Sequence, residues 1–187
     1  MNGPRGFPSW EDLYRNDTVE KLPWYWPALD PDLEAALVRY EVRSGSFLDL
    51  GTGPGTQAIA LAERGFKVTA TDISPAAIAY AARKAKAQGV DVSFMTDDIL
   101  ATQLTGPYGG VFDRGCFHVI APELRGSYAK TMHRLLAPTG WLFPIASRPT
   151  TSASVSEAID SRSSRSSIPS IKGNATRGLK RSFRSFG

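Results

Sequence analysis

Cysteine and histidine are scarce in this chain: one Cys, Cys116, and two His occur among 187 residues. A single cysteine excludes an internal disulfide and fits a reducing compartment, and a buried thiol at a strand end is favoured over a nucleophile. No apolar run approaches the length of a membrane span, and no signal-like apolar segment stands near the start. We therefore expect one soluble cytoplasmic domain without membrane partners.

Basic charge is also missing from most of the chain, although the formal net charge is +4. From Arg148 onward there are eight Lys or Arg against two acidic residues, so this segment carries +6 and the remainder −2. The body therefore lacks the footprint of a nucleic-acid-binding protein. Only the basic segment leaves nucleic-acid binding open, as an alternative.

The segment from Leu48 to Ser74, LDLGTGPGTQAIALAERGFKVTATDIS, is the most informative feature present. It predicts a buried strand, a glycine-rich turn, a helix over about 56–64, a second strand and an acidic residue, Asp72, at that strand's end. Glycines at alternate positions allow positive φ and close approach of a ligand. Asp72 comes 21 residues after the first glycine, where a carboxylate can accept hydrogen bonds from a ribose diol. The turn supplies candidate cofactor-binding residues Asp49, Gly51, Thr52, Gly53 and Gly55.

Two cofactors compete for this turn. A dinucleotide fingerprint, G-x-G-x-x-G, needs its third glycine at position 56, but that residue is Thr56 and the glycine comes at Gly55. Preceded by Asp49, the G-x-G-x-G pattern instead resembles motif I of class I S-adenosylmethionine (SAM)-dependent methyltransferases. The resemblance implies that SAM is the cofactor and that Asp72, with Ile73 beside it, holds the ribose. A nicotinamide-dependent hydride-transfer enzyme is the disfavoured alternative.

The resemblance continues downstream and covers residues 24–147. The third strand, about 92–95, is followed by Asp97, Asp98 and Ile99, and the family pattern assigns Asp98 to the adenine amino group and Ile99 to the ring. Asp97 is the second choice for the amino group. Segments 111–120 and 135–145 resemble the fourth-strand motif and the helix–turn–fifth strand, with Gly140 at the turn.

A purely structural interpretation stands beside this one. The glycines can form an ordinary strand–helix turn, and Asp72 can cap the helix that begins at Ser74-Pro75. Capping and ribose binding do not exclude each other. That several such features occur in the right order is what favours the binding site.

Ahead of the first strand, helices are predicted over 10–16 and 31–40, the second capped by Asp30 and started by Pro31. The aromatic segment 22–27 lies between two prolines and is not helical. It resembles a stretch that folds over the cofactor in the thiopurine and tellurite-resistance group of small-molecule methyltransferases. By that resemblance Trp24 covers SAM, since an indole face attracts a sulfonium. The alternative is that these aromatic residues only seal the edge of the sheet.

The fourth-strand motif supplies the candidate catalytic residues Asp113, Arg114 and His118. Arg114 can orient an anionic acceptor, Asp113 can pair with Arg114, and His118 can act as a general base. A structural role at a helix start is the alternative for His118. Gly109 occupies a position where the group has Asp, which predicts a weak start to this strand.

Together these features predict a Rossmann-like α/β fold: a doubly wound, mostly parallel sheet with helices on both faces, including helices over 74–88 and 121–136. The expected division is an N-terminal segment 1–45, a SAM-binding core 46–147 and a Ser/Arg-rich tail 148–187. The tail shows no pattern for the last strands of the family's seven-stranded sheet, so these are expected to be missing or altered.

The expected activity is methyl transfer to a small-molecule acceptor by a monomer or dimer, with no metal. The alternative is an impaired or truncated protein of this fold that binds SAM without catalysis.

Overall fold

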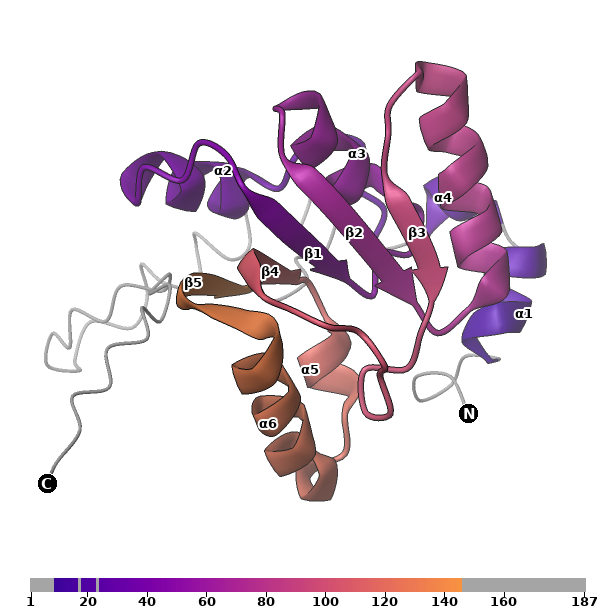
Figure 1. Ribbon diagram of the computed structural model, residues 1–187. Coiled ribbons are helices and arrows are strands. Elements are labelled where there is room, and N and C mark those ends of the chain that lie inside the picture. Colours follow the sequence, from indigo (N-terminus) through magenta and orange to yellow (C-terminus); the bar gives the residue numbers. More distant parts are fainter. Residues whose placement is uncertain (1–8, 17, 23, 146–187) are drawn as a thin grey trace, which may run out of the picture.

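The computed structural model describes residues 9–16, 18–22 and 24–145 (Figure 1). The expectations for the tail at 148–187 and for the last strands lie outside the described residues. In chain order the elements are α1 (Trp10–Asn16), the 3-10 turn η1 (Val19–Lys21), α2 (Pro31–Arg39), β1 (Ser46–Leu50), α3 (Thr56–Glu63), β2 (Lys67–Asp72), α4 (Pro75–Gln88), β3 (Ser93–Thr96), β4 (Tyr108–Asp113), α5 (Cys116–Val119), η2 (Pro122–Leu124), α6 (Arg125–Leu135) and β5 (Leu136–Pro144).

The five strands form one parallel sheet in the order β3-β2-β1-β4-β5. The chain builds outward from β1 to β3, then returns to place β4 on the other side of β1. The strand order therefore reverses between β1 and β4, and in such sheets ligands bind beyond the carboxyl ends at this point. The expected parallel, doubly wound arrangement is confirmed for the described residues.

Helices cover both faces, with α2, α3 and α4 above the sheet and α5 and α6 below it in Figure 1. Successive strand residues alternate between two cores, as the pleat requires. Phe47 and Phe112 pack with α2 and α3, whereas Leu48 and Val111 pack with α6. A third cluster, centred on Leu13, joins α1 to α4.

The helix starts follow the capping signals in the sequence. Asp30 accepts hydrogen bonds from the backbone N–H groups of Asp32 and Leu33, and Pro31 occupies the first turn of α2. Ser74 accepts from the Ala77 N–H at the start of α4, and Gly89 ends that helix in a left-handed conformation. These caps fix where β2 ends and α4 begins, next to Asp72.

β4 begins at Tyr108, and its pairing with β5 shifts register between Tyr108 and Gly110, at the glycine where a weak start was expected. The ring of Phe47 fills the space where a side chain at Gly110 would stand. The expected turn at Gly140 lies inside β5, where the register shifts between Tyr108 and Gly110 of the neighbouring strand. A Cβ at Gly140 would lie 2.8 Å from the Tyr108 carbonyl oxygen, so this irregularity needs glycine.

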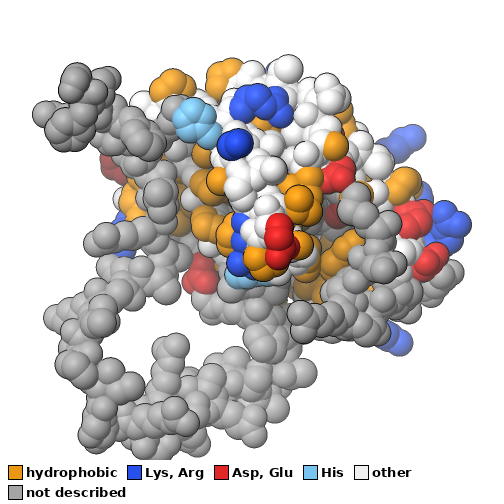
Figure 2. All heavy atoms as spheres, turned by 90° about the horizontal axis from the view of Figure 1, so that it is seen from below, with side chains coloured by type: hydrophobic (Ala, Val, Ile, Leu, Met, Phe, Trp, Pro, Cys, Tyr) orange, Lys and Arg blue, Asp and Glu red, His pale blue; other side chains and the backbone are white. Residues whose placement is uncertain are grey.

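Figure 2 shows the molecule from below, on the side of α5 and α6. Among the described residues of this face, acidic and basic side chains are interspersed with hydrophobic ones and form no continuous basic band. No helix in the described part of the chain is long and apolar enough to cross a bilayer.

Candidate functional site

The glycine-rich turn joins β1 to α3 at the carboxyl edge of the sheet. Gly51, Gly53 and Gly55 have φ values of +65°, +51° and +73°, a region that favours glycine. A Cβ at Gly51 would collide with the Cys116 sulfur, and one at Gly53 with the Tyr14 hydroxyl. At Gly55 it would lie 2.6 Å from the Cβ of Ala81, so this glycine also sets the close packing of α3 against α4.

Asp49 lies under this turn and is 2% exposed. It accepts a 2.6 Å hydrogen bond from the Thr52 hydroxyl and another from the Ala58 N–H in the first turns of α3. Burial raises the pKa of Asp49 to about 6, although both hydrogen bonds and the Arg114 charge oppose the shift. Asp49 therefore shapes the turn and places a carboxylate of elevated pKa beneath it.

Asp72 closes the other side of the turn from the end of β2. Its Oδ2 accepts from the Gly53 N–H and its Oδ1 from the Ser74 N–H, both at 2.9 Å. Burial raises the pKa of Asp72, against these backbone hydrogen bonds and one from the half-buried Ile73. The capping role weighed for Asp72 is thus present. Since each carboxylate oxygen can accept two hydrogen bonds, acceptor capacity for one ribose hydroxyl remains.

Asp97, Asp98 and Ile99, the candidates for contacts with adenine, follow the end of β3 and differ in their hydrogen bonds and burial. Asp98 uses Oδ1 to accept from the Leu100 N–H at 3.0 Å in its own turn, and Ile99 is buried in the lower core. Asp97 donates its backbone N–H to the Asp72 carbonyl, while its Oδ2 is buried without a hydrogen-bond partner in the described residues. Asp97 thus has a buried acceptor without a partner in the described residues, while the assignment of Asp98 to the adenine amino group stays a prediction.

We use "N-terminal strap" for α1, η1 and residues 24–30. Tyr14 of α1 is 8% exposed and places its hydroxyl over Gly53. The Trp24 indole N–H donates to that hydroxyl at 3.0 Å, and its ring packs edge-on to Trp10 at 5.7 Å. The aromatic segment expected to fold over the cofactor therefore lies beside the turn, with Tyr14 as the side chain nearest to Gly53.

Gln57 of α3 holds the end of the N-terminal strap. Its side-chain oxygen accepts from the Asp30 N–H at 2.7 Å, and its side-chain nitrogen donates to the Ala28 carbonyl at 2.8 Å. Gln57 is itself buried, so one amide satisfies two backbone groups of a non-repetitive segment. This contact fixes the path of the strap past the turn.

The three candidate catalytic residues take different positions. Asp113 does not form the expected pair with Arg114. It accepts instead from the N–H groups of Gly115, Cys116 and Phe117 and from the Tyr128 hydroxyl. These four donors fill its acceptor sites, so Asp113 anchors the start of α5. The catalytic role of Asp113 stays a prediction without support from this geometry.

Arg114 points to the N-terminal strap, with Nε 3.5 Å from Asp30 Oδ2 and a side chain 13% exposed. His118 is exposed on α5 and packs against Phe117. Cys116 stands at the start of α5 under Gly51, and burial with the nearby Asp113 raises its thiol pKa well above the usual value. A protonated thiol packed against the turn agrees with the structural role expected for it.

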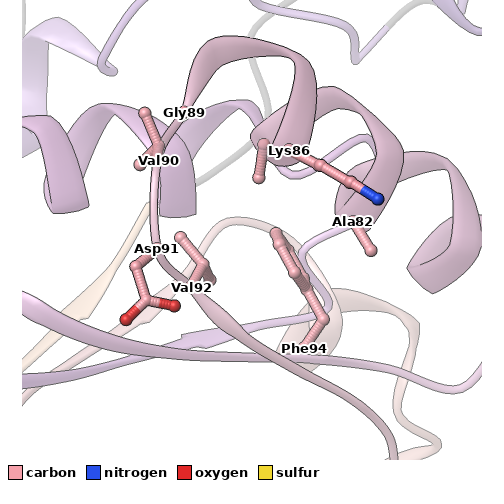
Figure 3. A pocket seen from close by; sticks show the side chains of 8 residues that line it. Ala82, Lys86, Gly89, Val90, Asp91, Val92 and Phe94 are labelled. Carbon is pink, nitrogen blue, oxygen red and sulfur yellow. The ribbon is translucent and has the colours of Figure 1, made fainter.

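A separate hollow of about 380 Å³ lies at the opposite end of β3, between the end of α4 and Val92 (Figure 3). Its lining is mostly apolar, with Lys86 and Asp91 as its charged residues. Its lining includes none of the candidate site residues, although the ring of its Phe94 lies 3.3 Å from the Cβ position of Gly55. Among the described residues, no group of three or more His, Cys, Asp or Glu is placed to hold a metal ion.

Comparison with known proteins decides the family. The methyltransferase domain family matches residues 47–140, half of the chain and the whole region from β1 to the middle of β5. The chain belongs to the methyltransferase domain family. Its parallel sheet, glycine-rich turn and strand-end carboxylates are those of a class I SAM-dependent methyltransferase domain.

Individual relatives agree with this family. The chain is 33% identical to a 2-heptyl-1-hydroxyquinolin-4(1H)-one methyltransferase of Mycobacteroides abscessus over 68% of this chain and 59% of that protein. It is 38% identical to a demethylmenaquinone methyltransferase of Thermus thermophilus over 65% and 52%. The chain thus spans between half and three fifths of the length of these relatives.

A solved relative extends the comparison to structure. The 1,6-didemethyltoxoflavin-N1-methyltransferase of Burkholderia thailandensis, solved with its substrate and S-adenosylhomocysteine, superimposes with a TM-score of 0.52 at 26% identity. That match covers 71% of this chain and 54% of the other. The narrower resemblance to the thiopurine and tellurite-resistance group stays a prediction.

Sequence reasoning missed Tyr14 and Gln57. Both signals were present only weakly, as a tyrosine on the apolar face of the first helix and a glutamine just inside α3. Their importance depends on contacts with segments far along the chain, which no local pattern records.

Proposed function

We propose that this chain binds SAM over the glycine-rich turn and transfers its methyl group to a small-molecule acceptor. SAM supplies an electrophilic methyl group on a positively charged sulfur. The observation that carries the proposal is the Asp72 carboxylate, held against the Gly53 N–H where the strand order reverses, with acceptor capacity left for a ribose. This is the position at which a parallel sheet presents bound nucleosides.

The charges around the turn support the same ligand. Asp49 and Asp72 are buried beside the turn and place negative charge where a sulfonium and an ammonium would lie. The buried Oδ2 of Asp97 offers an acceptor to the adenine amino group, in preference to Asp98. Ile99 and Ile73 stay the proposed apolar neighbours of the nucleoside, and Trp24 the proposed cover.

The acceptor is proposed to enter from the side of α5 and η2. His118 is exposed there, together with Val119 (54% exposed) and Leu124 (45% exposed). An exposed apolar surface beside an exposed imidazole suits a ring compound that carries an ionisable hydroxyl or ring nitrogen. The compounds in the names of the three relatives are ring compounds as well. Arg114 is proposed to orient an anionic acceptor, and cytoplasmic residence and a monomeric or dimeric state belong to the proposal.

Mass spectrometry of product mixtures tests this function. The protein is incubated with SAM and a panel of hydroxylated quinolones, naphthoquinols and pteridine-like heterocycles. The proposal expects formation of S-adenosylhomocysteine and a product 14 mass units heavier for at least one compound, with about tenfold less from His118→Ala. Binding of SAM with no transfer to any compound would favour the alternative of a SAM-binding module. No binding of SAM would reject both.

A further inference from the structure

The hydroxyl of Tyr14 lies directly over the glycine-rich turn, close enough to Gly53 that no side chain could stand between them. Tyr14 is 8% exposed, and it reaches the turn from α1, an element outside the matched domain of residues 47–140. Nothing in the motif pattern assigns it a role. Its position makes it a neighbour of any ligand that occupies the turn.

Most backbone N–H groups between positions 52 and 55 of the turn already have acceptors within the protein. The Thr52 N–H donates to the Thr71 carbonyl, the Gly53 N–H to Asp72 and the Gly55 N–H to the Thr52 carbonyl. Position 54 is proline and has no N–H. The backbone donors left for an anionic group are those at the start of α3, where the first intrahelical bond is Ile59 N–H to the Gly55 carbonyl. A side-chain donor over Gly53 would add to them.

The Tyr14 hydroxyl can act as such a side-chain donor. The Trp24 indole N–H occupies an acceptor site on its oxygen, which leaves the hydroxyl proton to be donated elsewhere. No acceptor for that proton stands within hydrogen-bond distance in the part of the chain that the structure describes. Burial and the nearby Asp72 raise the pKa of Tyr14 well above its usual range, so the hydroxyl stays protonated at neutral pH.

The N-terminal strap is fixed so that Tyr14 keeps this position. Glu11, one turn earlier on α1, accepts from the Ser74 hydroxyl at 2.7 Å and the Ala76 N–H at 2.9 Å. Further along, Glu20 accepts from the Tyr80 hydroxyl, and Lys84 donates to the Tyr25 hydroxyl at 3.1 Å. These ties follow one face of α4, at residues 76, 80 and 84.

We propose that Tyr14 is a cofactor-positioning residue whose hydroxyl donates to the carboxylate of the amino-acid arm of SAM. The inference rests on the proposed function, since it takes SAM as the ligand. The carboxylate is the one anionic group of SAM and can only accept hydrogen bonds, so it matches a hydroxyl whose proton is left to donate. The ribose and the adenine amino group find acceptors in Asp72 and Asp97 instead.

Calorimetric titration with two ligands tests this assignment. The ligands are S-adenosylhomocysteine and its decarboxylated analogue, 5′-[(3-aminopropyl)thio]-5′-deoxyadenosine, which lacks only the carboxylate. Tyr14→Phe should weaken binding of the first by about tenfold or more, the typical loss of a hydrogen bond to a charged group. It should leave binding of the analogue within about twofold, because no carboxylate is present to lose the contact.

Tyr25→Phe is the matched control, since it removes a strap hydroxyl that lies on Lys84 rather than over the turn. Tyr25→Phe should leave the affinity for both ligands unchanged. Equal weakening of both ligands by Tyr14→Phe, or of neither, would overturn the assignment. Failure of the unaltered protein to bind either ligand would reject the proposed function itself, which separates the two failures.

Discussion

Glycine at position 53 meets two separate demands. Its φ of +51° disfavours any side chain, and the Tyr14 hydroxyl occupies the space in which a Cβ would stand. Gly65 has a similar backbone, with φ of +86°, but nothing lies within 4 Å of its Cβ position. Comparing substitutions at Gly53 and Gly65 therefore separates the free-energy cost of the backbone conformation from that of the collision with Tyr14.

Gly65→Ala is expected to cost about 1 kcal/mol of unfolding free energy, the usual penalty for a left-handed alanine. Gly53→Ala should cost about 2–4 kcal/mol, because Tyr14 must also move within a packed core. Urea unfolding of both variants measures the difference. Equal losses would show that Tyr14 does not press on the turn.

Asp49 illustrates how a binding group can oppose stability. Burial raises its pKa to about 6, above the value of about 3.9 in an unfolded chain. The folded state therefore binds the proton more tightly, and the stability that this provides is fully present below about pH 4 and lost as the pH rises through 6. A neutral side chain of the same shape avoids that loss.

The difference in unfolding free energy between Asp49→Asn and the unaltered protein should accordingly shift in favour of the variant from pH 4 to pH 8, by on the order of 2 kcal/mol. The amide oxygen can still accept from the Thr52 hydroxyl. Urea unfolding at the two pH values gives the change. Asp91→Asn, at an exposed position, serves as control. A difference between Asp49→Asn and the unaltered protein that is the same at both pH values would contradict the account.

At the scale of elements, the last residues of the N-terminal strap, 24–30, belong to no helix or strand. Residues 24–30 depend on Gln57, whose amide satisfies the Asp30 N–H and the Ala28 carbonyl in a buried position. Arg114 adds a contact to the Asp30 side chain. The strap is thus fixed to the core by side chains from α3 and the end of β4.

Gln57→Leu should leave those backbone groups buried without partners, at a cost of about 2–3 kcal/mol. Hydrogen exchange of the Asp30 amide should rise by about tenfold or more, while amides in β1 keep their protection once corrected for global stability. Gln88→Leu, on the exposed end of α4, is the control. An unchanged Asp30 amide would show that the strap is held by other contacts.

Across the whole molecule, local signals predicted the elements and their order well. Asp30-Pro31 and Ser74-Pro75 start helices as expected, and alternation of apolar runs with helical segments predicts the parallel sheet that is observed. The carboxyl-edge positions of Asp49 and Asp72 follow from that sheet. Such features depend on neighbours close in sequence, which is why they can be read there.

The remaining features depend on contacts between distant segments. The preference proposed for Asp97 over Asp98 depends on the hydrogen bond that Asp98 accepts within its own turn. The absence of the Asp113–Arg114 pair depends on four donors that converge on Asp113. Tyr14 reaches Gly53 only because α1 packs on α4. No spacing rule along the chain encodes these arrangements.

The central claim is that SAM lies over the glycine-rich turn with its ribose on Asp72. Calorimetric titration of SAM into the unaltered protein, Asp72→Asn and the exposed control Asp91→Asn tests it most directly. The account predicts a single site in the unaltered protein and in the control, and binding at least about tenfold weaker in Asp72→Asn, because a charged acceptor is lost. Equal affinity in all three proteins would contradict the claim, as would no binding by the unaltered protein.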